Sequence, residues 1–139
     1  MMTKILTIGD IVIGDETNSD VTGYSWESSI SSDAEQRGNA IKDTLVVKGV
    51  IRTASAGVDD FTLKLAEWSR VSPNAADAYQ PVSIEAFNAG HVTRLVEFSD
   101  AFLVSYKEGF DDTMGSFEIT VRQRRDKMAG IKVSGNHPR

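Results

Sequence analysis

The sequence predicts a mainly β fold in a single domain, with about seven or eight short strands and one helix. Short runs of β-branched and aromatic residues alternate with polar residues, as in strands with one buried face. Glycine, asparagine and aspartate separate these runs at turn spacing. Only one stretch, residues 59–71, has helical periodicity instead. Many short strands of this kind form a barrel or a sandwich.

Length and composition narrow the class of protein. A chain of 139 residues with 40% hydrophobic residues is one domain with a core of ordinary size. No apolar run is long enough to cross a membrane as a helix, and the first residues lack the signal-peptide pattern, so we expect folding in the cytoplasm. The chain has no cysteine, which excludes disulfides, thiolate catalysis and cysteine-ligated metals.

Charge is distributed unevenly along the chain. The net charge is −5, so general affinity for nucleic acid is not expected. Residues 1–40 carry seven acids and two bases, a balance of −5, whereas residues 118–139 carry six bases and two acids, a balance of +4. Two interpretations remain open: two solvated surfaces, or an acidic and a basic face that meet head to tail between copies.

The first third of the chain predicts strands at 4–8 with 11–13, at 21–29 and at 44–53. Gly9 and Asp10 supply the turn between the first two. The polar stretch 31–42 is long for a hairpin connection, and long loops in compact domains are often functional or disordered. Gly49 within the third strand indicates a bulge or a sharp bend.

The predicted helix spans about residues 59–71 and flanks the sheet. Its apolar residues at helical spacing are Phe61, Leu65 and Trp68, with Leu63 off to one side. Asp59 or Asp60 can cap the first turn, and Pro73 ends the helix. An aromatic ligand pocket around Trp68 is the alternative interpretation.

The second half predicts two hairpins and a tail. The first hairpin joins residues 81–87 to 91–98, and the second joins 101–110 to an alternating strand at 117–121 through the turn 111–115. The tail 126–139 holds one short apolar group, Ile131 with Val133. It either adds a late edge strand or hangs free until a neighbouring copy orders it.

No motif for reaction chemistry is present. The two histidines, His91 and His137, have no partner at metal-ligand spacing, and no phosphate-binding glycine loop or GxSxG is found. The acid pairs at 59–60 and 111–112 are explained by helix capping and turn formation. We therefore expect no metal, no cofactor and no enzymatic activity. A Ser/His/Asp triad built on His91 stays open as an alternative.

Several strings resemble the haemolysin-coregulated protein (Hcp) family of type VI secretion and its relatives among phage tail tubes. Phe98-Ser99-Asp100-Ala101-Phe102 leads into Val104-Ser105-Tyr106-Lys107-Glu108-Gly109-Phe110-Asp111, and an alternating strand then ends in Arg122, Arg124 and Arg125. Upstream, Gly23-Tyr24-Ser25-Trp26 is similar to an early strand of that family, and 61–68 falls where the family has its single helix. The resemblance spans about residues 5–133.

The resemblance implies a twisted β-barrel of two mostly antiparallel sheets with one flanking helix. It implies a structural subunit of the inner tube of a contractile injection apparatus, in which six copies close into a ring, strand edge against strand edge, and rings stack. The partners it implies are further copies and the sheath, spike and effector proteins of the apparatus, with no nucleic acid and no stable membrane insertion. Assembly would be cytoplasmic, with export or injection as part of the tube.

Site residues follow from the resemblance. The hairpin 98–125 is expected at the barrel and the subunit contact, and the tail 126–139 is expected to order on assembly. The loop 31–42 is expected to reach the next ring. The expected contact residues are Asp33, Glu35, Arg37, Asn39, Arg122, Arg124 and Arg125.

Other functions remain open from the residues alone. A monomeric β-barrel module that binds a small ligand or a peptide would have a concave apolar pocket. A small hydrolase would need His91 close to an acid and a nucleophile. A phage-tail or tailocin tube would differ from a secretion tube in its neighbouring genes.

Overall fold

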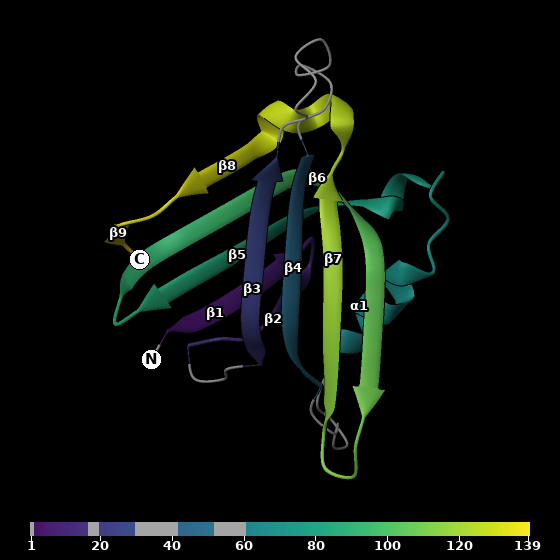
Figure 1. The fold of residues 1–139 in the computed structure, drawn as a ribbon, viewed down its shortest axis with the longest axis horizontal. Helices are drawn as coiled ribbons and strands as arrows, with labels where there is room; N and C mark the ends of the chain where they lie inside the picture. Colours follow the sequence, from purple (N-terminus) through teal and green to yellow (C-terminus); the bar gives the residue numbers. More distant parts are fainter. Residues whose placement is uncertain (1, 17–19, 30–41, 52–60) are drawn as a thin grey trace.

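The computed structural model of the protein describes residues 2–16, 20–29, 42–51 and 61–139 (Figure 1). Within these ranges the fold is mainly β with one α-helix, as predicted. The elements in chain order are β1 (Thr3–Ile8), β2 (Ile11–Ile13), β3 (Val21–Ser29), β4 (Lys42–Ile51), α1 (Phe61–Ser69), the 3₁₀ turn η2 (Ala76–Ala78), β5 (Tyr79–Asn88), β6 (His91–Phe110), β7 (Gly115–Gln123), the 3₁₀ segment η3 (Arg125–Gly130), β8 (Ile131–Ser134) and β9 (His137–Pro138).

All strands belong to one antiparallel sheet with the order β2-β1-β5-β6-β7-β4-β3, and β8 and β9 pair with β6. The sheet curls until β3, at one end of this order, lies beside β1 near the other end. Figure 1 shows the two layers that result: β3, β4 and β7 run roughly upright, and β1, β5 and the first half of β6 cross them obliquely. The two predicted sheets are these two layers of one twisted barrel.

Strand β6 joins the two layers. It is a single strand of 20 residues, where the sequence predicts two strands at 91–98 and 101–110. Up to Phe102 it pairs with β5, and from Ala101 onward it pairs with β7. A register shift between Leu103 and Ser105 marks a bulge just after this exchange of partners. Bulges increase local twist and bend a strand, which allows one strand to serve both layers.

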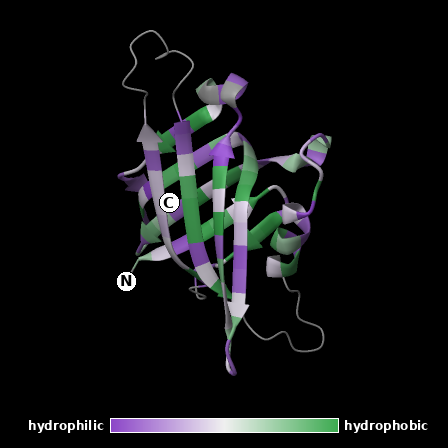
Figure 2. Cartoon of the chain, turned by 45° about the vertical axis from the view of Figure 1, so that its right-hand side comes forward, coloured by the Kyte–Doolittle hydropathy of each residue, from purple (hydrophilic) through white to green (hydrophobic). Residues whose placement is uncertain are grey.

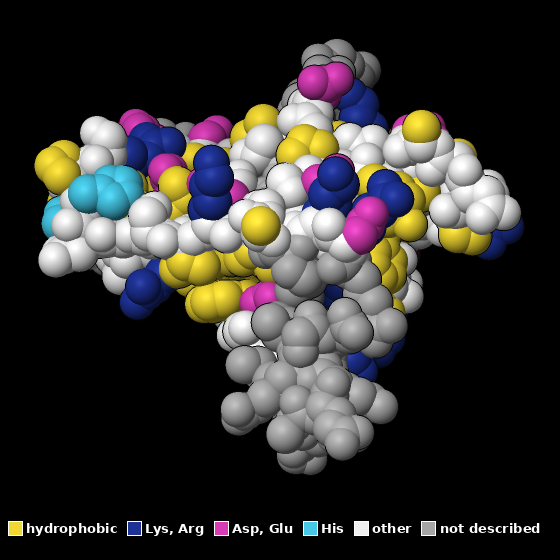
Figure 3. All heavy atoms as spheres, turned by 90° about the horizontal axis from the view of Figure 1, so that it is seen from above, with side chains coloured by type: hydrophobic (Ala, Val, Ile, Leu, Met, Phe, Trp, Pro, Cys, Tyr) yellow, Lys and Arg dark blue, Asp and Glu magenta, His cyan; other side chains and the backbone are white. Residues whose placement is uncertain are grey.

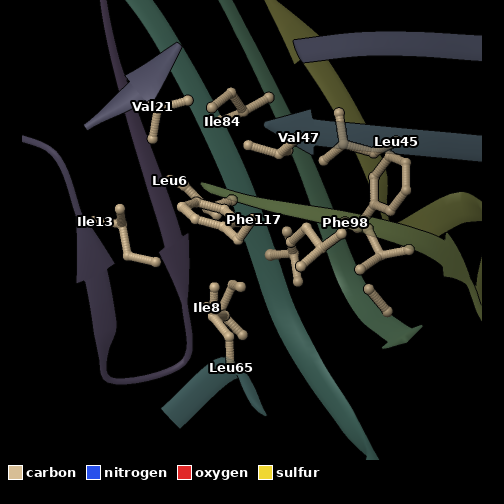
Figure 4. Packing of buried hydrophobic residues seen from close by; sticks show 14 of the residues in the cluster. Leu6, Ile8, Ile13, Val21, Leu45, Val47, Leu65, Ile84, Phe98 and Phe117 are labelled. Atoms are coloured by element: carbon tan, nitrogen blue, oxygen red, sulfur yellow. The ribbon is translucent and has the colours of Figure 1, made fainter. Parts of the chain in front are cut away.

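The core lies between the layers. Leu6 and Ile84 come from the oblique layer and Leu45 and Phe117 from the upright layer, and all four are buried (Figure 4). Along β7 the predicted alternation is confirmed, because Phe117 and the residues two and four further on are buried. Figure 2 shows the same alternation of hydrophobic and hydrophilic residues along the other strands.

Helix α1 covers one end of this core. Leu65 and Trp68 are buried in the core cluster, whereas Leu63 is 55% exposed, as its helical position predicts. The side chain of Phe61 and the predicted caps at 59–60 lie outside the described residues. The helix ends at Ser69, two residues before the prediction.

The tail 126–139 contributes a late edge strand, which is one of the two predicted alternatives. Ile131 pairs with Phe98, and Ser134 pairs with Leu95, so β8 continues the oblique layer beyond β6. Among the residues described, no helix is long and apolar enough to span a membrane.

Candidate assembly surfaces

On each side, the upright layer ends in a strand that has one described partner strand. On one side β3 pairs only with β4, over residues Val21–Ser29. On the other side, β7 is the only described strand that pairs with β6 beyond Phe102. Strands at the end of a sheet can pair with a strand of another chain. The two end strands are different segments, so a contact between one and the other would join two different surfaces.

The hairpin of β6 and β7 extends past the ends of β3 and β4 (Figure 1). Phe110 and Met114, on either side of the turn, are 65% and 45% exposed. The backbone of Gly115 lies against one face of the Phe110 ring, because a Cβ built on this glycine would be 2.6 Å from ring atoms. The end of the hairpin, residues 110–114, therefore presents two large apolar side chains to solvent. We call this segment the hairpin tip.

The turn at the tip is fixed by Asp111. Its Oδ1 atom accepts hydrogen bonds from the backbone N–H groups of Thr113 and Met114, both at 2.8 Å. The bond from the Met114 N–H is the larger of the causes that lower the pKa of the Asp111 carboxyl below its ordinary value. The Asp111 backbone N–H also donates to the Met114 carbonyl at 2.9 Å. The side-chain turn chemistry predicted at Asp111 is thus confirmed, whereas Gly115, predicted as the end of the turn, is the first residue of β7.

The two predicted basic contact residues whose side chains are described, Arg122 and Arg124, have different partners. Arg122 lies on the outer face of the upright layer, where its Nε donates to Thr44 Oγ1 at 3.2 Å. Arg124 lies beyond the end of β7, with its guanidinium 4.9 Å from the centre of the Tyr79 ring and 2.7 Å from Asp126. Strand β7 ends at Gln123, so of these two residues only Arg122 lies on the strand.

Other predicted contact residues cannot be placed. The side chain of Arg125, and all of Asp33, Glu35, Arg37 and Asn39, lie outside the described residues. Figure 3 looks onto the end of the molecule that carries η3 and shows basic and acidic side chains interspersed there.

Some of the basic charge near the C-terminus pairs with acidic residues of the same molecule. Arg139 pairs with Glu85 at 2.7 Å and with Glu16, and its guanidinium lies 4.0 Å above the ring of Phe87. The hydrogen bond to Glu85 is the main cause that raises the pKa of Arg139. These contacts hold the end of β9 against β5, so part of the charge asymmetry stabilises the chain itself.

A polar network that the sequence analysis missed fixes the bend of β6. Gln123 is 4% exposed, and its amide Nε2 donates to Ser99 Oγ at 2.9 Å and to the Lys127 carbonyl at 2.6 Å. Its Oε1 accepts the backbone N–H of Asp100 at 2.9 Å. Ser99 and Asp100 belong to the string that carries the family resemblance. The only sequence signal was a polar pair inside an otherwise apolar strand.

Two grooves lie beside α1. The acidic groove is lined by Ile8, Asp10, Ile11, Lys64, Glu67, Trp68, Val71, Asp77 and Gln80. The apolar groove has a volume of about 270 Å³ and is lined by Trp68, Ser69, Val71, Pro73, Ala78, Tyr79, Phe102 and Leu103. Its floor is fixed by the Trp68 indole N–H, which donates to the Ala78 carbonyl at 3.1 Å.

The histidines of the described chain have no carboxylate among the hydrogen-bond partners that the structure gives them. His91 Nε2 lies 3.2 Å from the side-chain oxygen of Asn136, and His137 Nδ1 lies 2.9 Å from the Pro138 carbonyl. No group of three or more histidines and carboxylates among the described residues could hold a metal ion.

Comparison with known proteins gives a match of fold over nearly the whole chain. No protein-family model matches the sequence, and no curated protein matches it. Among solved structures, Hcp1 from Flavobacterium johnsoniae superposes with a TM-score of 0.60 and 16% identity, covering 96% of each chain. A chain of the PVC sheath–tube complex, an extracellular contractile injection system, gives 0.56 and 17% identity over 96% of this chain and 88% of that one.

A type VI secretion system effector from Yersinia pestis gives a TM-score of 0.57 and 11% identity, covering 96% of this chain and 98% of that one. In each comparison the match covers most of both chains, so the likeness extends to the whole barrel, its helix and its hairpins. The chain therefore has the fold of Hcp1 and of the matched chain of the PVC sheath–tube complex.

Proposed function

We propose that the protein is a structural subunit of the inner tube of a contractile injection or secretion apparatus. The observation that carries this proposal is the match to Hcp1 over 96% of both chains, which leaves little of either protein outside the common fold. The two end strands of the upright layer, β3 and the second half of β6, supply the means of assembly.

The edges define the type of contact between copies. Residues 21–29 of one copy add as a strand beside residues 104–110 of the next. Because two different surfaces meet, the contact is heterologous, and repetition closes a ring when the rotation per copy divides the circle. We propose six copies per ring, stacked through the loop 31–42. This pairing would extend the sheet of one copy into the next.

The remaining partners follow from the place of a tube in such an apparatus. Sheath, spike and effector proteins would contact the assembled rings and not the lone subunit. Assembly would take place in the cytoplasm before the tube is expelled.

Solution mass tests the proposal most simply. Multi-angle light scattering of the purified chain, measured over a hundredfold range of concentration, should give a mass several times 15.2 kDa that falls on dilution. A variant, Ser28→Pro in β3, should shift the mass toward one copy while keeping a cooperative thermal transition, because the pairing register with β4 points the Ser28 N–H away from β4. A single copy of the unaltered chain at every concentration would contradict the proposal and favour a monomeric binding module.

A further inference from the structure

We propose that the hairpin tip of one copy inserts into the apolar groove of the next copy. This inference rests on the proposed function, since it adds a second contact between subunits of the same assembly. The groove lies between α1 and β6 and the tip lies at the far end of β6, so the contact links successive copies head to tail. In this contact, the apolar groove of each copy receives the hairpin tip of a neighbouring copy.

The tip is shaped as an anchor. Phe110 has the highest exposed fraction among the large hydrophobic residues of the described chain, at 65%, and Met114 beside it is 45% exposed. Apolar groups gathered at a projecting end commonly mark a contact with another protein. The Asp111 hydrogen bonds already fix the turn, at 2.8 Å to two backbone N–H groups. Docking a fixed turn loses less conformational freedom than docking a flexible loop.

The apolar groove matches this anchor in size and polarity. Its volume of about 270 Å³ lies just below the range of about 300–1,000 Å³ that is usual for small-molecule sites. None of its lining residues is charged. Three lining residues, Val71, Tyr79 and Leu103, are only half-buried, so apolar surface is available for contact with another chain. One aromatic side chain with a neighbouring methionine fits such a space better than a cofactor does.

The tip cannot reach the groove of its own chain. Leu103 lines the groove, and Phe110 is seven residues further along the same strand, which is about 23 Å at about 3.3 Å per residue. Groove and tip are thus fixed at the two ends of one strand segment. A second copy is the occupant that this geometry selects.

Charge selects the apolar groove over its acidic neighbour. The tip carries Asp111 and Asp112, and the neighbouring groove is lined by three carboxylates and one lysine. The apolar groove has no charged lining residue, and beside it Arg124 stacks on Tyr79 and pairs with Asp126. An acidic tip is therefore repelled less by the apolar groove than by the acidic one.

Cysteine trapping tests the contact directly, because the natural chain has no cysteine. Met114→Cys places a thiol at the tip, and Ser69→Cys or Pro73→Cys places one at the groove. A disulfide requires Cβ atoms within about 3.5–4.5 Å. Under mild oxidation, a mixture of tip and groove variants should give crosslinked heterodimers at least fivefold above the homodimers of either variant. Met114→Cys mixed with Val133→Cys, on β8, is the control and should give background yield.

A second variant measures the energetic role of the tip. Phe110→Ser should raise the concentration of half-assembly by about tenfold or more, since a large apolar side chain loses its buried site. Background crosslinking from both groove positions, together with unchanged assembly of Phe110→Ser, would overturn the tip-in-groove contact while the unaltered chain still assembles. If the unaltered chain remains a single copy, both this contact and the proposed function fail.

Discussion

Gly49 lies where the sheet leaves no room for a side chain. A Cβ at this position would be 2.4 Å from both the Asp20 carbonyl and the Phe117 ring. The Asp20 carbonyl is held in place by the Val50 N–H at 2.8 Å. The bulge that the sequence indicates near Gly49 is found on the partner strand, between Val21 and Gly23.

Gly49→Ala should therefore destabilise the fold by about 1–3 kcal/mol, the usual cost of overpacking. Urea unfolding followed by circular dichroism measures this difference. Gly23→Ala is the matched control, because nothing lies within 4 Å of the Cβ that it would add. Equal unfolding midpoints for the two variants would show that the strands move apart easily.

The hydrogen bonds of Gln123 predict that replacing this residue lowers the free energy of unfolding. Gln123→Leu removes three partly buried hydrogen bonds, to Ser99, to the Lys127 carbonyl and from the Asp100 N–H, and a typical hydrogen bond contributes about 0.5–1.5 kcal/mol. The variant should also loosen β8, since the network ties η3 to the bend of β6. Hydrogen exchange of the β8 amides measures this loosening. Ser116→Ala, on the outer face of the same strand, should leave these amides unchanged.

Asp111 predicts a pH dependence confined to the hairpin tip. Its folded pKa is lowered, so the carboxylate stabilises the turn at pH values above the unfolded pKa of about 3.9. The stabilisation is lost as the pH falls below that value through the folded pKa. Amide chemical shifts of Thr113 and Met114 should titrate in this acidic window. Asp111→Asn keeps an oxygen acceptor and should abolish the titration, and a titration that persists would assign it to another group.

At the scale of elements, α1 contributes one buried face. Leu65→Ala should lower the free energy of unfolding by about 2–5 kcal/mol, because Leu65 is fully buried in the core. Leu63→Ala, at a position that is 55% exposed, should change it by less than about 0.5 kcal/mol. Thermal unfolding of the two variants tests this difference. Similar losses would mean that Leu63 is covered, for instance by a neighbouring copy.

Elements with a local signal were predictable from the sequence. Strand β3 begins and ends at the predicted residues, and the helix face follows from the spacing of Leu65 and Trp68. The continuity of β6 was not predictable, because Ser99 and Asp100 look like a turn. What keeps them in a strand is Gln123, more than twenty residues later in the chain. Long-range hydrogen bonds of this kind leave no periodic pattern.

The candidate site was predicted only in part, for the same reason. The turn at Asp111 was recognised from its own residues. The apolar groove brings Trp68 and Pro73 beside Phe102, and no spacing along the chain reveals that contact. Residues 31–41 of the predicted loop lie outside the described residues, and Lys42 is the first residue of β4, so the role of the loop in stacking remains a prediction.

At the scale of the whole molecule, the basic residues at the end of β7 and just after it, Arg122 and Arg124, are expected to act between copies. Reversal of both Arg122 and Arg124 to glutamate should weaken assembly most at low salt, where surface charges act over the longest distance. Lys4→Glu combined with Lys132→Glu makes the same change in net charge at other positions. Light scattering at several salt concentrations compares the two. Equal weakening would indicate an effect of net charge alone.

The central claim is that copies of this chain assemble through two different surfaces of each subunit. Electron microscopy of the concentrated, unaltered protein tests it most directly, because the images show both closure and polarity. The proposed function predicts closed rings or stacked tubes in which all subunits point the same way around the ring. Lone particles, or pairs related by a two-fold axis, would contradict it.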